Sequence, residues 1–322
     1  MKSKTLLLGL LLSLTCPGSM QTLVAQDEDV RGAFLTTRPK ASAKGKTSSA
    51  STKPSRRRPK TVAPKAVDAS NTSAGNTKTP VQTPPKVAAA QRIGLGLTLF
   101  MRDSNGLSVR VDPTREFRKG DHVRVLLESN ADGYLYIFNT TDAGTPMMIY
   151  PDPQLDEAGN YIQSHVPVEI PSSLAAEERL KWFTFDANPG IEKLHFVFTR
   201  EPLATVPIED DLISFCRDNA TACPWAPGAE VWARIQKQAS ESGQIAKPKG
   251  LGTAQTGAEQ QAATRGIGLN RDDAEPSLIM LTASTGTDML VATIELVHKV
   301  ASLDTEEGAA EAVVQVEEQP KR

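Results

Sequence analysis

Two apolar runs flank a turn in residues 122–138, HVRVLLESNADGYLYIF. The runs at 122–128 and 134–138 are rich in β-branched, aromatic and other large apolar residues, a composition that favours strands. The segment between them, Asn130-Ala131-Asp132-Gly133, consists mostly of residues that tolerate the backbone angles of a tight turn. The stretch therefore predicts two strands joined by a turn.

The same pattern of short strand-like segments extends in both directions from this stretch. Short apolar or alternating segments, separated by turn-forming residues, occur at 93–99, 109–111, 147–150, 166–170, 182–185, 194–198, 278–281 and 289–297. Pro167 cannot donate to a β-ladder, so its segment is expected at a sheet edge. The last two segments are expected to pair as a closing hairpin. The pattern predicts a mainly β chain with an antiparallel β-sandwich-like domain, and a barrel fits the same pattern.

Between residues 205 and 239 the apolar spacing changes to that of helices. Pro207 and Glu209 suit a helix start, because proline is tolerated early and acids face the positive end of the helix dipole. A second helix is predicted over residues 230–238. Residues 240–275 contain almost no large apolar side chains, so a flexible loop is predicted there.

The N-terminus has the features of a cleavable secretory signal peptide. Lys2 and Lys4 supply a positive start, residues 6–14 form an apolar run, and Ala25 precedes Gln26 at the expected cut. The apolar run is shorter than the roughly 20 residues that span a bilayer. No later segment has the composition of a transmembrane helix. We therefore expect an exported protein, periplasmic or extracellular after cleavage near Ala25-Gln26.

Residues 26–91 are rich in Ala, Ser, Thr, Pro and Lys, and Phe34 is their one aromatic residue. Such a composition buries too little apolar surface to offset the entropy of ordering, so a disordered basic linker is predicted. This linker carries the basic run Arg56-Arg57-Arg58. The predicted organisation is a signal peptide (1–25), the linker (26–91), a β-sandwich domain (92–204), a helical excursion (205–239), a flexible loop (240–275), a closing β-hairpin (276–300) and an acidic disordered tail (301–322).

Charge singles out no class of partner. Removal of the signal peptide takes away two bases and no acid, so the formal charge changes from −2 to −4. The basic run could bind nucleic acid, but export argues against that. A protein or an anionic envelope polymer fits an exported chain better, and a solvated tether is the alternative.

Two cysteines remain after cleavage, Cys216 and Cys223. In an oxidising compartment an isolated pair favours a disulfide. Two free thiols and a metal-binding pair are the alternatives, although a metal site needs further ligands.

Several short motifs occur in an order that points to a family. They are Phe117-Arg118-Lys119-Gly120-Asp121, Asp132-Gly133-Tyr134-Leu135-Tyr136, Tyr150-Pro151, Ile170-Pro171, Pro189-Gly190 and Thr199-Arg200-Glu201-Pro202-Leu203. Together they resemble the bacterial domain of unknown function catalogued as family 4384, over residues 93–204. The resemblance implies a β-rich, non-catalytic accessory module, often found in exported proteins. It supplies no catalytic residues.

No catalytic, cofactor or metal-binding constellation is predicted. His122, His165, His195 and His298 are dispersed along the chain and are interpreted as structural. The acids Asp142, Asp152, Asp156 and Glu157 lack the ligand order of an EF-hand and are interpreted as a solvated loop. The Gly-x-Gly pairs at 94–96 and 266–268 open no helix of a βαβ unit, so they indicate no nucleotide site.

Two functional hypotheses follow from these features. The first is an exported, non-enzymatic module that makes protein–protein or envelope-surface contacts. The second is a domain that binds a glycan or peptidoglycan fragment through exposed aromatic side chains, for which Tyr134, Tyr136, Tyr150 and Trp182 are the candidates. Ordinary core packing of these aromatic residues is the simpler alternative.

Overall fold

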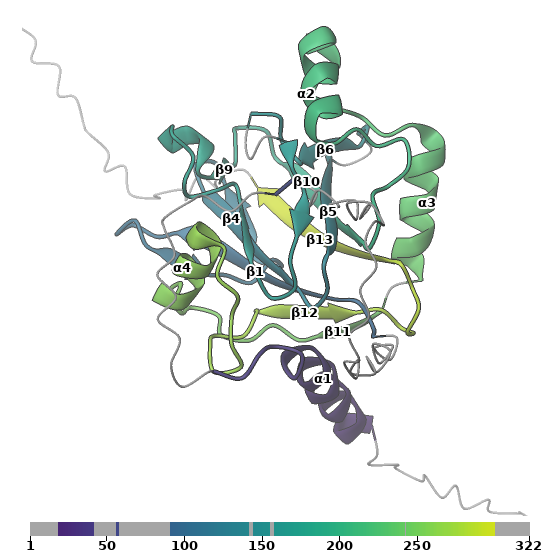
Figure 1. Ribbon diagram of the computed structural model, residues 1–322. Helices are drawn as coiled ribbons and strands as arrows, with labels where there is room; N and C mark the ends of the chain where they lie inside the picture. The colour runs from purple at the N-terminus through teal and green to yellow at the C-terminus, as the bar shows by residue number, and fades with distance from the viewer. Residues whose placement is uncertain are drawn as a thin grey trace, which may run out of the picture.

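The computed structural model describes residues 19–41, 56–57, 91–141, 144–154, 158–241 and 243–299. Within these ranges two β-sheets pack face to face, with helices on their outer sides (Figure 1). The predicted mainly β, sandwich-like fold is therefore confirmed. Residues 1–18, Arg58, most of the predicted linker and the acidic tail lie outside the described ranges. None of the described helices is long and apolar enough to cross a membrane.

The first sheet has seven strands and is centred on β1. Its path is β11-β12-β1-β4-β8, with β2 pairing β1 and β9 pairing β4. β1 and β4 run antiparallel from Leu95 opposite Ser129 to Met101 opposite Val123. The strand bounds are β1 Gly94–Arg102, β2 Ser108–Arg110, β4 His122–Ser129, β8 Val168–Ile170, β9 Phe183–Thr184, β11 Gln244–Ala246 and β12 Leu278–Leu281.

The second sheet has six strands and is centred on β10. Its path is β3-β13-β10-β5-β6, with β7 pairing β5. All pairs are antiparallel except the one between β3 and β13, which is parallel. The strand bounds are β3 Glu116–Arg118, β5 Gly133–Thr141, β6 Met147–Tyr150, β7 Tyr161–Ile162, β10 Gly190–Thr199 and β13 Met289–Lys299.

The main core lies between the two sheets. Because alternate residues of a strand point to opposite faces, each strand sends every second side chain inward. Leu95, Leu97 and Leu99 of β1 point into this core, as do Phe196 and Phe198 of β10. The alternation predicted for these segments therefore reflects a sheet with one face against the core.

The predicted closing hairpin of residues 276–300 is wrong. β12 pairs with β1 in the first sheet, whereas β13 pairs with β10 in the second. The turn between them crosses from one sheet to the other instead of joining partners in one ladder. Two strands separated by a turn have the same local pattern in both arrangements, so the sequence did not distinguish them.

The helical excursion packs on the outer face of the second sheet (Figure 1). It contains α2 (Glu209–Asp218), the short 3-10 helix η3 (Ala220–Ala222) and α3 (Ala229–Ser240). Leu212 of α2 and Ile235 of α3 join a second apolar cluster with Tyr136, Phe138 and Val197 of the sheet. The second sheet therefore has buried apolar side chains on both faces.

Residues 240–275 are not a flexible loop, which corrects the prediction. They contain β11, which pairs with β12, and α4 (Gly257–Arg265). A capping box starts α4, in which the Thr256 side chain accepts from the Glu259 backbone and the Glu259 side chain accepts from the Thr256 backbone. Gly266 ends the helix with a left-handed φ of 65°. The helix cap and buried polar contacts, rather than large apolar side chains, stabilise this segment.

The beginning of the predicted linker is also ordered. α1 spans Ser19–Leu35, and its residues Val30 and Phe34 pack with Ile279 and Leu281 of β12 (Figure 1). The described part of the predicted linker, residues 27–41 and 56–57, is therefore part of the folded domain. The other residues from 42 to 90 lie outside the described ranges.

Candidate functional site

The four aromatic residues predicted to form a binding surface are buried. Tyr134, Tyr136, Tyr150 and Trp182 are 5%, 0%, 3% and 8% exposed, respectively. The Tyr136 hydroxyl accepts a hydrogen bond from the Leu203 backbone at 3.0 Å. The Tyr150 hydroxyl donates to the Gly159 carbonyl at 3.3 Å. These side chains hold the fold together and provide no exposed platform, so that part of the prediction is wrong.

Trp182 packs under a buried charge. The Arg124 guanidinium carbon lies 3.9 Å from the centroid of the Trp182 ring, a cation–π contact. Arg124 also pairs with Glu169 at 3.3 Å and donates twice to the Lys181 carbonyl. Burial lowers the pKa of Arg124 and Glu169 opposes that shift, so the guanidinium stays charged.

Two arginines of the predicted basic arm belong to the fold. Arg56 is 5% exposed and donates to the Pro167 carbonyl at 3.0 Å. Its own carbonyl accepts from the Tyr161 backbone at 2.9 Å. Arg57 pairs with Asp210 of α2 at 2.9 Å. Arg58 lies outside the described ranges. Because Arg56 is buried and Arg57 is paired, these two arginines do not form a solvated basic patch.

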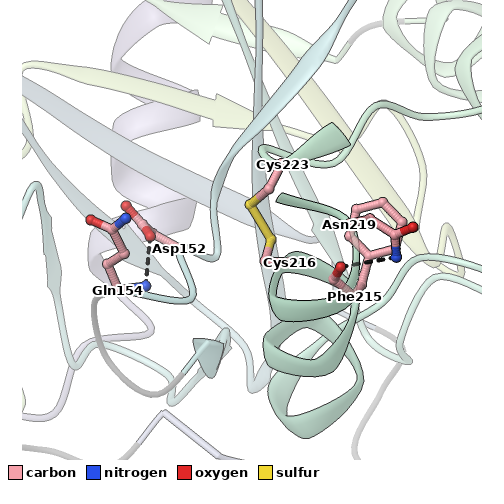
Figure 2. Close-up of a disulfide and its surroundings, with 6 residues drawn as sticks. All are labelled: Asp152, Gln154, Phe215, Cys216, Asn219 and Cys223. Atoms are coloured by element: carbon pink, nitrogen blue, oxygen red, sulfur yellow. Dashed lines mark hydrogen bonds between the residues drawn. A yellow bond between two sulfur atoms is a disulfide. The ribbon is translucent and has the colours of Figure 1, made fainter. Parts of the chain in front are cut away.

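The predicted disulfide is present in the structure. Figure 2 shows Cys216 of α2 joined to Cys223, with an S–S distance of 2.11 Å. The bridge closes the short stretch that contains η3, where the Asn219 side chain donates to the Phe215 carbonyl at 3.1 Å. It fixes the turn between the two helices that cover the second sheet.

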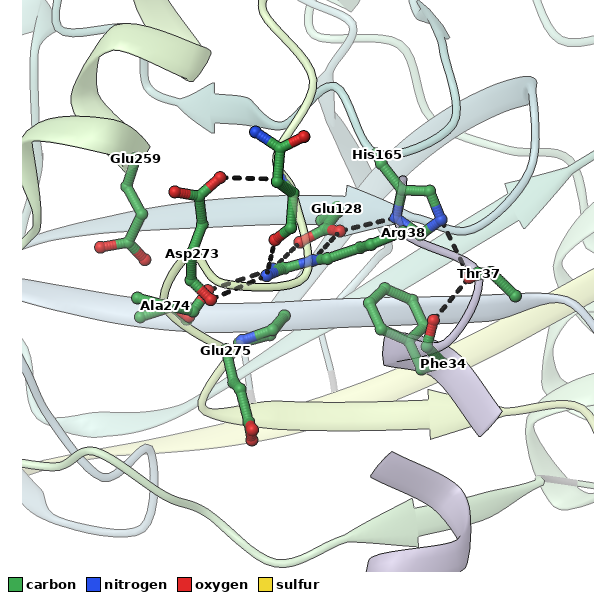
Figure 3. Close-up of polar contacts among 12 residues, drawn as sticks. Phe34, Thr37, Arg38, Glu128, His165, Glu259, Asp273, Ala274 and Glu275 are labelled. Atoms are coloured by element: carbon green, nitrogen blue, oxygen red, sulfur yellow. Dashed lines mark hydrogen bonds and ion pairs between the residues drawn. The ribbon is translucent and has the colours of Figure 1, made fainter. Parts of the chain in front are cut away.

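A buried ionic cluster links the N-terminal segment to the first sheet (Figure 3). Arg38, which is 1% exposed, donates from Nε and Nη2 to the two oxygens of Glu128 at 2.8 and 2.6 Å. His165 Nδ1 lies 2.7 Å from Glu128 Oε1, and its Nε2 lies 2.9 Å from the Thr37 hydroxyl. The remaining Arg38 donors reach the carbonyls of Asn270, Asp273 and Ala274.

Further buried pairs complete a polar layer on the same outer face of the first sheet. Arg110 of β2 pairs with Glu259 of α4 at 2.5 Å, and both side chains are at most 3% exposed. Arg31 of α1 donates to the carbonyls of Pro276 and Ser277. Buried charges are tolerated when they are paired and hydrogen-bonded, as these are. Arg31 Nε is buried without a partner, and the other contacts named here attach α1 and α4 to the sheet.

A groove opens at one end of the sandwich, where the ends of both sheets meet. Its volume is about 510 Å³, within the range of ligand sites. Its apolar wall is made by Val123, Ile149, Phe183, Leu194 and Leu296, and its polar lining includes Asn139, Thr141, Thr184, Asp186, Asn188, Glu192 and His298. The groove therefore combines apolar side chains at the edge of the core with polar groups from four strands and the β9–β10 loop.

Hydrogen bonds fix the two carboxylates of this groove. Glu192 Oε2 accepts from Asn139 Nδ2 at 2.9 Å and from the Thr141 hydroxyl at 2.8 Å. Asp186 accepts from the backbone and side chain of Asn188, both at 2.7 Å. These bonds, the backbone one first, hold the pKa of Asp186 below its ordinary value, so it is ionised at neutral pH.

Aromatic rings support the groove on the side of β3 and β13. Phe185 stacks on Phe117 with ring centroids 4.8 Å apart, and it contacts the buried His298 ring at 5.2 Å. The backbone of Phe185 also exchanges hydrogen bonds with Gly120 and Asp121. The loop that carries Asp186 is therefore anchored immediately before the groove.

In the described ranges no three His, Cys, Asp or Glu side chains gather as a metal site. Asp142, Asp156 and Glu157 of the acidic loop lie outside these ranges, and Asp152 accepts from the Gln154 backbone at 2.8 Å (Figure 2). Of the four acids in the predicted solvated loop, only Asp152 is described.

The motif order identified in the sequence has a counterpart among known families. Residues 116–202 match the model of the domain of unknown function DUF4384. The predicted resemblance is therefore confirmed over the span from β3 to just beyond β10. No curated protein and no solved structure matches the chain. The DUF4384 segment supplies every lining residue of the groove except Leu296 and His298.

Sequence reasoning missed the groove and the ionic cluster. The groove residues are ordinary strand and loop residues, and only the meeting of the two sheets brings them together. The sequence had one local signal for the segments that carry the buried arginines. Gly94 and Gly96 lie within a strand, where a glycine often marks the close approach of another segment of the chain. A side chain at Gly94 would overlap Phe34 of α1, and one at Gly96 would overlap Pro276.

Proposed function

We propose that this protein is an exported, non-catalytic module that binds a protein partner in the cell envelope through the groove at the end of its sandwich. The observation that carries the proposal is the groove itself, in which apolar core side chains meet oriented polar groups. Such a combination is typical of recognition sites, because apolar contact contributes affinity and fixed polar groups contribute specificity. The signal-peptide features of residues 1–25 support an envelope location.

The partner presents an extended segment to the groove. About 510 Å³ accommodates a few side chains rather than a whole domain surface. The apolar wall accepts an aliphatic stem, and the rim of Asn139, Thr141, Asn188 and Glu192 supplies donors and acceptors. An extended peptide meets both requirements, because its side chains and backbone groups alternate along its length.

The test uses the chain from Gln26 onward and asks whether capture depends on the groove. Thr184 is exposed in β9 and lines the groove, so Thr184→Trp fills the space without removing a core side chain. Thr285, an exposed residue in the β12–β13 turn at the opposite end, provides the matched control Thr285→Trp. We expect the wild type and Thr285→Trp to capture the same envelope protein, and Thr184→Trp to lose it at least tenfold.

Two other results would count against the proposal. Equal capture by all three chains would exclude the groove as the contact surface. Capture that persists in Thr184→Trp but disappears in a chain with Lys60, Lys65, Lys78 and Lys86 changed to Gln would assign binding to the basic segment. That result would favour an anionic envelope polymer over a protein partner, because contacts between lysines and an anionic polymer are electrostatic and weaken with salt.

A further inference from the structure

Only acidic charges line the groove, apart from the His298 ring. Asp186 and Glu192 face it, and among its described lining residues there is no lysine or arginine. Two bases on the flanking strands are engaged in ion pairs: Lys193 pairs with Glu295 at 2.8 Å, and Lys299 pairs with Glu116. A cationic group entering the groove would therefore meet two carboxylates and no competing lysine or arginine of the described chain.

One carboxylate is held ready for such a group. Both hydrogen bonds to Glu192, from Asn139 and Thr141, end on Oε2. Among the described residues no donor contacts its second oxygen, Oε1, and the side chain is half-buried. An oriented, partly desolvated carboxylate with one open oxygen attracts a cation more strongly than a mobile carboxylate on the surface does.

The geometry favours a lysine over an arginine. An arginine guanidinium binds best when both oxygens of one carboxylate are open to its fork of donors. In Glu192 one oxygen is occupied, and in Asp186 both oxygens accept from Asn188. A lysine ammonium is a compact charge that needs only single contacts, and its four methylene groups can lie along the apolar wall.

We propose that the groove recognises a lysine side chain in an extended segment of the partner, with the ammonium bound by Glu192 and assisted by the charge of Asp186. This inference rests on the proposed function and specifies its ligand. The stem of the lysine packs on Ile149 and Phe183, the partly exposed members of the apolar wall, and the ammonium donates to Glu192 Oε1. Recognition of this kind makes the groove selective for charge as well as for shape.

The probes are three capped pentapeptides that differ only at the centre: Ac-Ala-Val-Lys-Val-Ala-NH₂ and its norleucine and arginine counterparts. Binding to the chain from Gln26 onward is measured by calorimetry at low salt. We expect the lysine peptide to bind at least tenfold more tightly than the norleucine peptide, with arginine between them. Glu192→Gln should abolish this preference, so that the lysine and norleucine peptides bind with similar affinity.

The matched control is Glu201→Gln, because Glu201 is an exposed acid just beyond the other end of β10. It should retain the full preference for lysine. Equal binding of the lysine and norleucine peptides would overturn the charge recognition but leave the groove as a binding site. If no peptide binds while capture of the envelope protein remains sensitive to Thr184→Trp, the lysine inference fails and the proposed function survives. If no peptide binds and Thr184→Trp does not reduce capture of the envelope protein, both the lysine inference and the proposed function are refuted.

Discussion

At the scale of single residues, this chain relies on charges buried in pairs. Arg38 with Glu128, Arg110 with Glu259 and Arg124 with Glu169 all lie on the outer face of the first sheet, and each side chain is at most 6% exposed. Desolvation makes each charge costly, and its partner offsets that cost only while both are present. Removing one member is therefore more damaging than the net strength of the pair suggests.

The Glu128 carboxylate provides the clearest test of this view. Glu128→Gln leaves the buried Arg38 guanidinium without its counter-charge, so we expect the free energy of unfolding to fall by about 3 kcal/mol. Urea denaturation measures the loss. The control Glu178→Gln removes an acid that pairs with Arg102 and Lys181 at the surface, and should cost much less stability. Similar losses of unfolding free energy in the two variants would show that the buried Arg38–Glu128 pair matters no more to stability than a surface pair.

His195 predicts a dependence of stability on pH. Burial lowers the pKa of His195 from its ordinary value of 6.5, and nearby Lys193 acts in the same direction. The unfolded chain therefore binds this proton more readily than the folded chain. Stability should decrease as pH falls from about 6.5 towards the folded pKa, and the loss should be complete below that pKa.

The variant His195→Gln tests this dependence. Glutamine can still bond to Thr293 and Thr140, which contact the imidazole at 3.0 and 3.3 Å, but it does not titrate. Thermal melts of both chains between pH 7.5 and pH 5 should show a steeper loss of Tm for the wild type. Parallel curves would mean that another group causes the acid sensitivity.

At the scale of elements, α1 is joined to the sandwich by one apolar and one ionic anchor. Phe34 is fully buried against β12, and Arg38, just beyond the end of the helix, pairs with Glu128 of β4. Every described side chain of α1 that packs on the domain lies after Gln26, so these contacts persist if the chain is cut at Ala25-Gln26. The helix is a docked element of the fold rather than the start of a tether.

We expect Phe34→Ala to loosen α1 selectively. Loss of a buried phenylalanine costs about 3 kcal/mol, which corresponds to a roughly hundredfold loss of amide protection where opening is local. Hydrogen exchange should show this loss in residues 27–38 and little change in β10 and β13. The control Asp29→Ala removes an exposed side chain of the same helix and should leave protection intact. Uniform loss across both sheets would show that α1 does not open separately.

At the scale of the whole molecule, the family segment and the folded domain differ in extent. DUF4384 matches residues 116–202, whereas β1 in the centre of the first sheet and β13 within the second lie outside that segment. α1 and α4 also come from outside it and cover the first sheet, and β11, also from outside it, forms one edge of that sheet. Described segments on both sides of residues 116–202 therefore complete the two sheets.

This arrangement predicts that deletion of residues 26–41 destabilises the domain. The deletion removes Arg31, Phe34 and Arg38, and leaves Glu128 without its arginine. We expect Tm to fall by about 10 °C or more, as a loss of several kcal/mol implies for a domain of this size. Deletion of residues 301–322, the predicted acidic tail, should leave Tm unchanged. An unchanged Tm after the first deletion would return this segment to the role of a linker.

Although β3, β7 and β11 were not predicted, the fold class, most strand segments, the two covering helices, the cysteine pair and the family likeness could be predicted from the sequence. All of these depend on local alternation, helical spacing or motif order, which neighbouring residues express directly. Even α4 had a local signal, the Thr256–Glu259 capping box followed by Gly266, which its low content of large apolar residues obscured.

Three features became visible only in the folded chain. They are the sheet that each strand joins, the folding of residues 27–41 onto the domain, and the position of the groove. β12 and β13 read as a hairpin until their partners, β1 and β10, are known. From the sequence, Arg38 belongs to the predicted disordered basic linker. The structure shows that it pairs with Glu128, 90 positions away in the sequence. Pairings over such distances depend on which surfaces meet after folding, and no local pattern of residues records that.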